Sequence, residues 1–162
     1  GAQVLTAQGV ALLHSGREFC RTKKGNGNSY KSPDAINHLD WPRKKEFADV
    51  VDYYKKLIRL RKNHPAFRMP EAEHIRNNLH FCMDYKTGVV SYCLEGAAVG
   101  DSWETMVLIF NGNRKEVVIP LPEGKYSIMA NASDISENGL EEVEGEVVVE
   151  AISMLLLVKI QI

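Results

Sequence analysis

The feature that most constrains the fold is a series of short apolar runs in the second half of the chain, each ended by a turn sequence. Runs rich in β-branched and aromatic residues, separated by Gly, Pro or Asn, predict β-strands. Seven strands are predicted, at His80–Tyr85, Val89–Leu94, Thr105–Phe110, Glu116–Ile119, Tyr126–Ala130, Glu146–Glu150 and Ile152–Ile160. No helical stretch separates the later strands, so we expect an antiparallel β-sandwich.

A long helix is predicted before these strands. Between Lys44 and Asn63, apolar residues recur at the three- and four-residue spacing of one helical face. The predicted face consists of Phe47, Val50, Val51, Tyr54, Leu57, Ile58 and Arg61. His64-Pro65 ends the helix, because the residue before a proline disfavours the helical conformation.

The first residues suggest the end of a helix followed by a buried strand. Residues 2–9 contain helix formers and finish at Gly9, a typical helix C-terminal residue. Val10–Leu13 is a nearly continuous apolar run, which is typical of a parallel strand covered on both faces. Such a strand needs neighbours that this sequence does not supply.

The chain therefore divides into two predicted units. Residues 1–64 are too few and too irregular to bury a core alone, whereas residues 65–162 approach the usual size of a domain. The expected class is mostly β, with a helix, a strand and a second helix before the sandwich.

Composition excludes several classes of function. The 20 Lys and Arg residues balance 21 Asp and Glu, which gives no general attraction to nucleic acid or to an anionic membrane. The longest apolar run, Met154–Val158, is too short to cross a bilayer. No signal-peptide pattern follows Gly1, and the cellular location is left open.

The cysteines and histidines indicate no metal site. Cys20, Cys82 and Cys93 lie outside any CxxC spacing, and no histidine pair has the HExxH spacing. We predict buried free thiols that act as small apolar side chains, with a Cys82–Cys93 pair across a hairpin as the alternative.

Residues 14–42 form a long loop rich in Gly, Pro, Asn and Ser, and loops of this length are commonly functional. The segment LLHSGREFCRTKKGNGNSYKSPDAINHLDW, residues 12–41, resembles the loop after the eighth barrel strand of type I pullulanases in the α-amylase superfamily. The helix YYKKLIRLRKNHPAF resembles the last barrel helix, and DSWETMVLIFNGNRKEVVIPLPEGKYSIMAN resembles the C-terminal β-domain. The chain departs from the family at Arg17, usually a carboxylate, and at Cys20, usually apolar.

This resemblance implies that residues 1–64 are the C-terminal remnant of a (β/α)8 barrel and residues 65–162 an all-β sandwich. It implies the C-terminal part of a debranching glycoside hydrolase that cleaves α-1,6-glucosidic bonds of pullulan, starch or glycogen with retention. The family's catalytic carboxylates lie upstream of the eighth strand. We therefore expect no catalytic residue, metal site or cofactor here, and no activity from this polypeptide alone.

Loops after barrel strands surround the active site in (β/α)8 enzymes. Sugars offer hydroxyl groups and apolar ring faces, so amide, carboxylate and aromatic side chains suit their recognition. Asn28, Tyr30 and Asp34 are accordingly the predicted substrate-binding residues, with turn stabilisation as an equal alternative for Asn28 and Asp34. Trp41 is predicted to pack beneath the last helix, and His14 to be structural.

The expected partners are an α-glucan, through the longer enzyme, and the rest of the barrel. Val10–Leu13 and the helix face would lack barrel partners in this chain, so self-association is also expected. The alternative function is a non-catalytic carbohydrate-binding or structural β-sandwich module. Exposed aromatics on one sheet face would favour binding, whereas burial of Trp103, Tyr92 and Tyr126 would favour a structural role.

Overall fold

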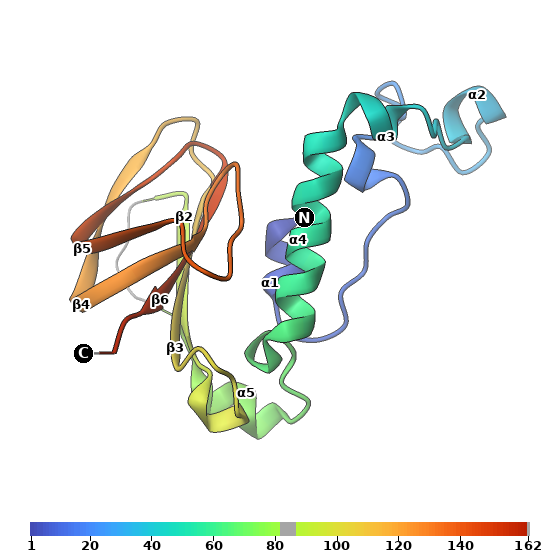
Figure 1. The fold of residues 1–162 in the computed structure, drawn as a ribbon. Coiled ribbons are helices and arrows are strands. Elements are labelled where there is room, and N and C mark those ends of the chain that lie inside the picture. The colour runs from blue at the N-terminus through green and yellow to red at the C-terminus, as the bar shows by residue number, and fades with distance from the viewer. Residues whose placement is uncertain (82–86, 162) are drawn as a thin grey trace.

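A helical arm, residues 1–64, packs against one face of a six-stranded sheet (Figure 1). The structure is a computed structural model that describes residues 1–81 and 87–161. The helical segments are α1 (Ala2–Thr6), η1 (Arg17–Phe19), α2 (Asp34–Asn37), α3 (Arg43–Glu46), α4 (Ala48–Asn63), η2 (Pro65–Arg68), α5 (Ala72–Asn78) and η3 (Ala97–Val99). The strands are β1 (Leu79–Phe81), β2 (Val89–Glu95), β3 (Thr105–Asn111), β4 (Val117–Ala130), β5 (Glu141–Val149) and β6 (Ser153–Lys159).

Every strand pair in the sheet is antiparallel, in the order β1-β2-β3-β6-β4-β5. The predicted antiparallel class is confirmed. Two predicted strands merge into β4, because the predicted turn at 122–124 is an irregularity within it, where the register shifts between Pro120 and Lys125. Gly124 has φ 127°, a conformation that favours glycine.

The sheet separates two hydrophobic cores, because successive residues of a strand point to opposite faces. Met106 and Leu108 of β3 belong to a core shared with Leu57 and Leu60 of α4, which we call the outer core. The inner core contains β3, β4, β5 and β6 residues: Val107, Ile109, Val117, Ile119, Tyr126, Ile128, Val147, Val149, Leu155 and Leu157. Since β3 and β6 share that core with β4 and β5, the sheet is folded over itself as in a sandwich.

The long helix is present but its buried face differs from the prediction. α3 and α4 meet at Phe47, whose φ of −113° and ψ of 46° interrupt the helix. Leu60, outside the predicted face, is 1% exposed, whereas the predicted Ile58 is 40% exposed. The physical reason is that α4 has apolar residues on two sides, and the sheet covers the Leu57 and Leu60 side.

The predicted strand at Val10–Leu13 is wrong for this chain. The segment belongs to no strand, and Val10 and Leu12 are 100% and 84% exposed. A parallel strand requires hydrogen-bonding neighbours, and the described residues offer it none. The preceding residues are held by Arg61, whose guanidinium donates to the carbonyls of Leu5 (3.0 Å), Ala7 (2.7 Å) and Gly9 (2.5 Å).

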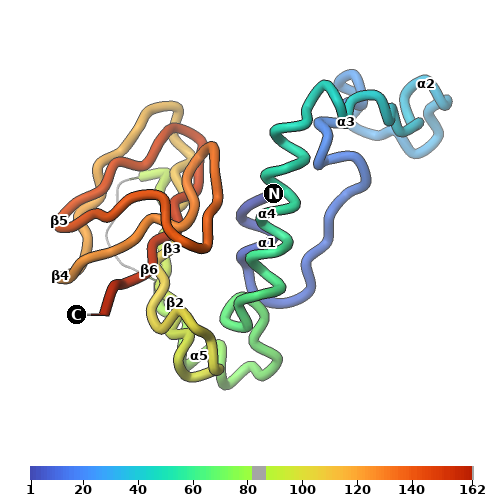
Figure 2. Tube along the Cα trace, in the orientation of Figure 1, coloured from blue at the N-terminus to red at the C-terminus, as the bar shows by residue number. Residues whose placement is uncertain are grey.

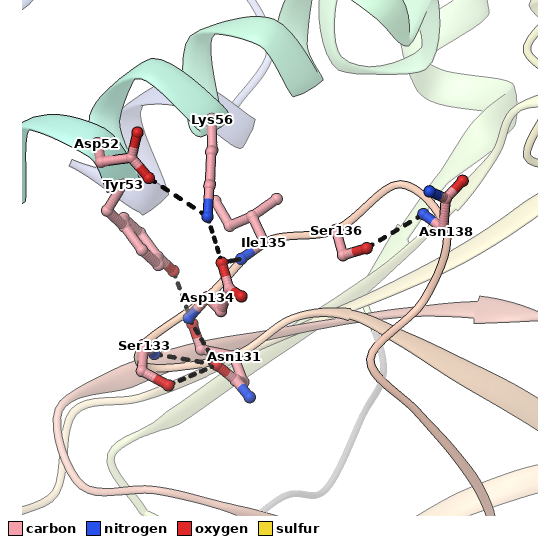
Figure 3. A network of polar contacts seen from close by, with 9 residues as sticks. All are labelled: Asp52, Tyr53, Lys56, Asn131, Ser133, Asp134, Ile135, Ser136 and Asn138. Carbon is pink, nitrogen blue, oxygen red and sulfur yellow. Dashed lines mark hydrogen bonds and ion pairs between the residues drawn. The ribbon is translucent and has the colours of Figure 1, made fainter. Parts of the chain in front are cut away.

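Polar contacts attach α4 to the loop between β4 and β5 (Figure 3). Lys56 Nζ lies 2.6 Å from Asp134 Oδ1 and 3.3 Å from Asp52 Oδ2. The Tyr53 hydroxyl donates to the Asn131 carbonyl at 2.7 Å. The Asn131 side-chain oxygen in turn accepts the Asp134 amide at 2.9 Å, so the loop presents Asp134 to the helix.

Two smaller expectations concern cysteines and membranes. Cys20 is free and half-buried, Cys93 is half-buried in β2, and Cys82 lies outside the described residues. Among the residues that the structure describes, no helix has the length and apolar character needed to span a bilayer.

Candidate functional site

The candidate site is the loop of residues 14–42, which Figure 2 shows beside the N-terminal half of α4. Phe19 of η1 is completely buried and anchors the loop, with its ring 5.7 Å from that of Trp41. Arg43 of α3 donates to the Cys20 carbonyl at 2.8 Å. Arg21 donates to the Asn37 carbonyl, which joins the two ends of the loop.

Asn37 organises the middle of the loop. Its side-chain amide donates to the carbonyls of Ser29 and Ser32, both at 2.8 Å. Its side-chain oxygen accepts from Lys23 Nζ at 2.6 Å, and the same ammonium donates to Ser29 Oγ at 3.1 Å. Every polar atom of the Asn37 side chain is therefore used to hold the loop.

The three predicted substrate-binding residues all lie on the surface of this loop. Tyr30 is 86% exposed, and Asn28 and Asp34 are exposed as well. Asn28 Oδ1 accepts the Tyr30 amide at 3.5 Å, so Asn28 also has the turn-stabilising role considered above. Asp34 begins α2, and within residues 1–81 and 87–161 no hydrogen bond joins its side chain to Asn28 or Tyr30.

A cleft of about 480 Å³ separates the loop from α4. Its apolar lining includes Leu13, Leu39, Trp41, Val51 and Ile58. Trp41 is 56% exposed, and Lys44 lies over its ring at 4.7 Å, so it only partly packs against the helical region. His14 lines the same cleft and is exposed.

Sequence reasoning missed Asn37 and the arginines that fix the loop. Their partners are mainly backbone carbonyls distant in sequence, and such bonds leave no spacing pattern. The available signal was the position of Asn37 next to the LDW block of the resemblance, which does not by itself indicate a bracing role.

Both tyrosines of the sheet are buried, whereas Phe81 of β1 is exposed and Phe110 of β3 is half-buried. Tyr92 is 8% exposed and Tyr126 is 2% exposed. Trp103 is half-buried and stacks on His64 with a centroid distance of 3.6 Å. Burial therefore favours a structural role for these rings rather than a carbohydrate-binding face.

Comparison with known proteins agrees with this architecture. Residues 75–134 match a family described as "Pullulanase, all-beta domain". Pullulanase of Bacillus subtilis strain 168 is 40% identical over 141 residues, which is 86% of this chain and 20% of that protein. The structure of pullulanase from Bacillus acidopullulyticus is similar with a TM-score of 0.90 and 41% identity, over 98% of this chain and 19% of that chain.

A third relative extends the same result. Pullulanase of Anoxybacillus sp. LM18-11, solved with maltotetraose, has a TM-score of 0.85 and 36% identity over 98% of this chain and 22% of that chain. The matched residues 75–134 run from α5 into the loop after β4, so the sheet contains the segment that resembles the all-β domain of pullulanases. The chain is similar to one part of pullulanases over nearly its whole length, and it spans about a fifth of the length of these relatives.

Proposed function

We propose that this chain is the C-terminal part of a debranching glycoside hydrolase that cleaves α-1,6-glucosidic bonds with retention. The observation that carries the proposal is the similarity to a pullulanase structure over 98% of the chain at 41% identity. The division into a barrel remnant, residues 1–64, and a β-domain, residues 65–162, is part of the same proposal.

The polypeptide is proposed to be inactive alone. Retaining hydrolysis needs two carboxyl groups about 5–5.5 Å apart, one as nucleophile and one as acid and base. Glu18, an acidic residue of the loop, accepts the Gly16 amide at 3.1 Å and so ties a turn. Asp34 is exposed at the start of α2.

The loop is proposed to form part of the sugar-binding rim. Tyr30 offers an exposed ring for a pyranose face, and Asn28 and Asp34 offer groups for its hydroxyls. The Asn37 contacts fix the backbone beside them, which reduces the entropy lost when sugar binds.

The apolar surfaces of the arm are proposed to contact the rest of the barrel. Val10, Leu12 and Trp41 are exposed, and exposed apolar patches mark interaction surfaces. The same surfaces would make the isolated chain self-associate. Leu12→Ser should shift it toward monomer in sedimentation, and a wild-type chain that stays monomeric at all concentrations would contradict this.

The function is tested with a chimera. The purified chain should release no reducing ends from pullulan, whereas a Bacillus subtilis pullulanase carrying this chain in place of its matching segment should release them. Within the chimera, Tyr30→Ala should raise KM by up to about tenfold, because an aromatic contact contributes roughly 0.5–1.5 kcal/mol. Lys31→Ala, at a neighbouring exposed position, is the control.

Two results would contradict the proposal. Hydrolysis by the chain alone would show that the reacting carboxylates are present in it. If Tyr30→Ala left the KM of the chimera unchanged, the loop would not be part of the sugar-binding rim.

A structural module is the second candidate, favoured by the burial of Tyr92 and Tyr126. Affinity electrophoresis in pullulan separates it from a binding module. If the sheet is only structural, pullulan in the gel should not slow the migration of the chain.

A further inference from the structure

A small basic pocket lies on the candidate loop, beside the start of α3. It has a volume of about 150 Å³ and four basic side chains in its lining. These are Arg21, Lys24, His38 and Arg43, and the lining is completed by Thr22, Ala35 and Asp40.

The acids at the pocket do not balance all of its positive charges. Arg21 and Arg43 donate to backbone carbonyls, which satisfy hydrogen bonds but carry no formal charge. The carboxylate recorded beside Arg43 is that of Glu46, at 3.7 Å and 60% exposed, so the pair contributes little. Three fixed positive charges thus face one lining carboxylate, Asp40, which leaves a net charge of +2 (3 − 1) before any on His38.

Both arginines keep unused donor capacity. The Nε atoms of Arg21 and Arg43 are buried and have no hydrogen-bond partner within the described residues. These Nε atoms are covered by protein atoms, so the outer nitrogens of the two guanidinium groups are the ones that can contact a ligand in the pocket. His38 Nδ1–H donates to the Asp34 carbonyl at 2.6 Å, which leaves its Nε2 for another group.

Backbone strain occurs at the same place. Lys24 has φ 51° and Cys20 has φ 56°, values that residues other than glycine rarely adopt. The Lys24 conformation is supported by its amide, which donates to Thr22 Oγ1 at 3.0 Å. Strained residues of this kind concentrate at ligand-binding sites, and here the strain accompanies a cationic side chain in the pocket wall.

We propose that this pocket binds a phosphate group. A phosphate carries a charge near −2 at neutral pH, which complements the net charge of the pocket, and guanidinium groups match its oxygen geometry. The phosphate can be an ester on a glucose unit of the glucan or free phosphate, which share this chemistry. The phosphate ester on the glucan rests on the proposed function, whereas binding of free phosphate depends on the residues of the pocket alone.

The experiment is calorimetric titration of the folded chain with inorganic phosphate, glucose 6-phosphate and glucose. Both phosphates should bind saturably, more weakly as NaCl rises, and glucose should give no signal. Lys24→Asn should weaken phosphate binding roughly tenfold, because it removes one charged contact while Asn tolerates the left-handed backbone. Lys31→Asn, an exposed lysine of the same loop outside the pocket lining, should bind as the wild type does.

The outcomes distinguish a sugar phosphate from free phosphate, and they show whether the pocket binds phosphate at all. Tighter binding of glucose 6-phosphate supports a sugar ester, and equal or tighter binding of inorganic phosphate supports free phosphate. Absence of saturable phosphate binding, equal losses in the two lysine variants, or a glucose signal matching that of glucose 6-phosphate overturns the site. The pullulan assay of the chimera reports independently on the proposed hydrolase.

Discussion

Replacing Asp101 by Asn should destabilise this chain strongly, because Asp101 and His64 form a buried pair where α4 meets the sheet. His64 Nδ1 lies 2.7 Å from Asp101 Oδ1, and the two side chains are 4% and 0% exposed. The same oxygen accepts the Trp103 amide at 3.0 Å, and the other oxygen accepts the Ala66 amide at 3.1 Å. One carboxylate therefore accepts from His64 and Ala66, which follow α4, and from Trp103, which precedes β3.

The magnitude follows from what Asn cannot do. Asp101→Asn keeps the shape but turns one acceptor oxygen into a donor, so one buried N–H loses its partner at a cost of about 1–3 kcal/mol. The remaining bonds lose their charge assistance, about 1 kcal/mol each. A total loss of roughly 3–5 kcal/mol is expected, comparable to breaking other buried pairs and large beside a typical folding free energy of about 5–15 kcal/mol.

The assay is urea unfolding at about pH 7, followed by circular dichroism, for Asp101→Asn, His64→Gln and the double variant. The cycle should give a coupling free energy above roughly 1 kcal/mol. Asp49→Asn, an exposed carboxylate at the start of α4, is the control and should stay within about 0.5 kcal/mol of wild type. A loss below about 1 kcal/mol for Asp101→Asn would refute the reasoning.

The pH dependence supplies a second check. Burial alone would raise the pKa of Asp101, but the hydrogen bonds from His64 and from the Trp103 and Ala66 amides outweigh it and lower the pKa below 3.8. A lowered folded-state pKa stabilises the protein above the unfolded-state value and loses that effect as pH falls through the folded-state value. The difference in unfolding free energy between wild type and Asp101→Asn should therefore narrow as the pH falls below about 4.

Three further predictions concern the same junction. Gly96→Ala should lower stability by about 2–3 kcal/mol in urea unfolding, because the added Cβ would lie 2.1 Å from the Trp103 carbonyl oxygen. Lys56→Met should lower the urea midpoint, and the difference should shrink in about 1 M NaCl, because its contact with Asp134 (Figure 3) is a partly exposed ion pair. Burial and, to a smaller extent, the negative charge of Asp134 raise the pKa of Tyr53 to about 12. Tyr53→Phe should therefore remove the tyrosine ionisation that occurs at the highest pH in an alkaline absorbance titration.

The strands were predictable where turn residues and alternating apolar positions agree. β2, β3 and β6 lie within a residue or two of their predicted ranges. β4 was predicted as two strands, because Pro122 and Gly124 signal a turn in sequence while pairing with β5 continues on both sides of them. A local turn signal cannot reveal that a neighbouring strand bridges the interruption.

The site was predictable in location but not in construction. The order of sequence blocks places Asn28, Tyr30 and Asp34 in one loop, and this inference needs only the sequence. The bracing by Asn37 and the meeting of Arg21 with Arg43 depend on how the loop folds back. The side of α4 that is buried likewise depends on which side the sheet covers, which amphipathic spacing alone leaves undecided for a helix with two apolar sides.

The division predicted between residues 64 and 65 leads to a last prediction. The inner core is formed entirely by strand residues, from Val107 to Leu157, so residues 65–162 should keep their sheet when the arm is removed. The outer core, however, pairs Met106 and Leu108 with Leu57 of α4, and removing the arm would expose that sheet face to water. A chain trimmed to residues 65–162 should therefore retain its β circular dichroism but bind the apolar dye ANS and unfold at lower urea than the full chain. If the trimmed chain matched the full chain in urea midpoint and bound no dye, the outer core would contribute nothing to the stability of the sheet, and this prediction would be wrong.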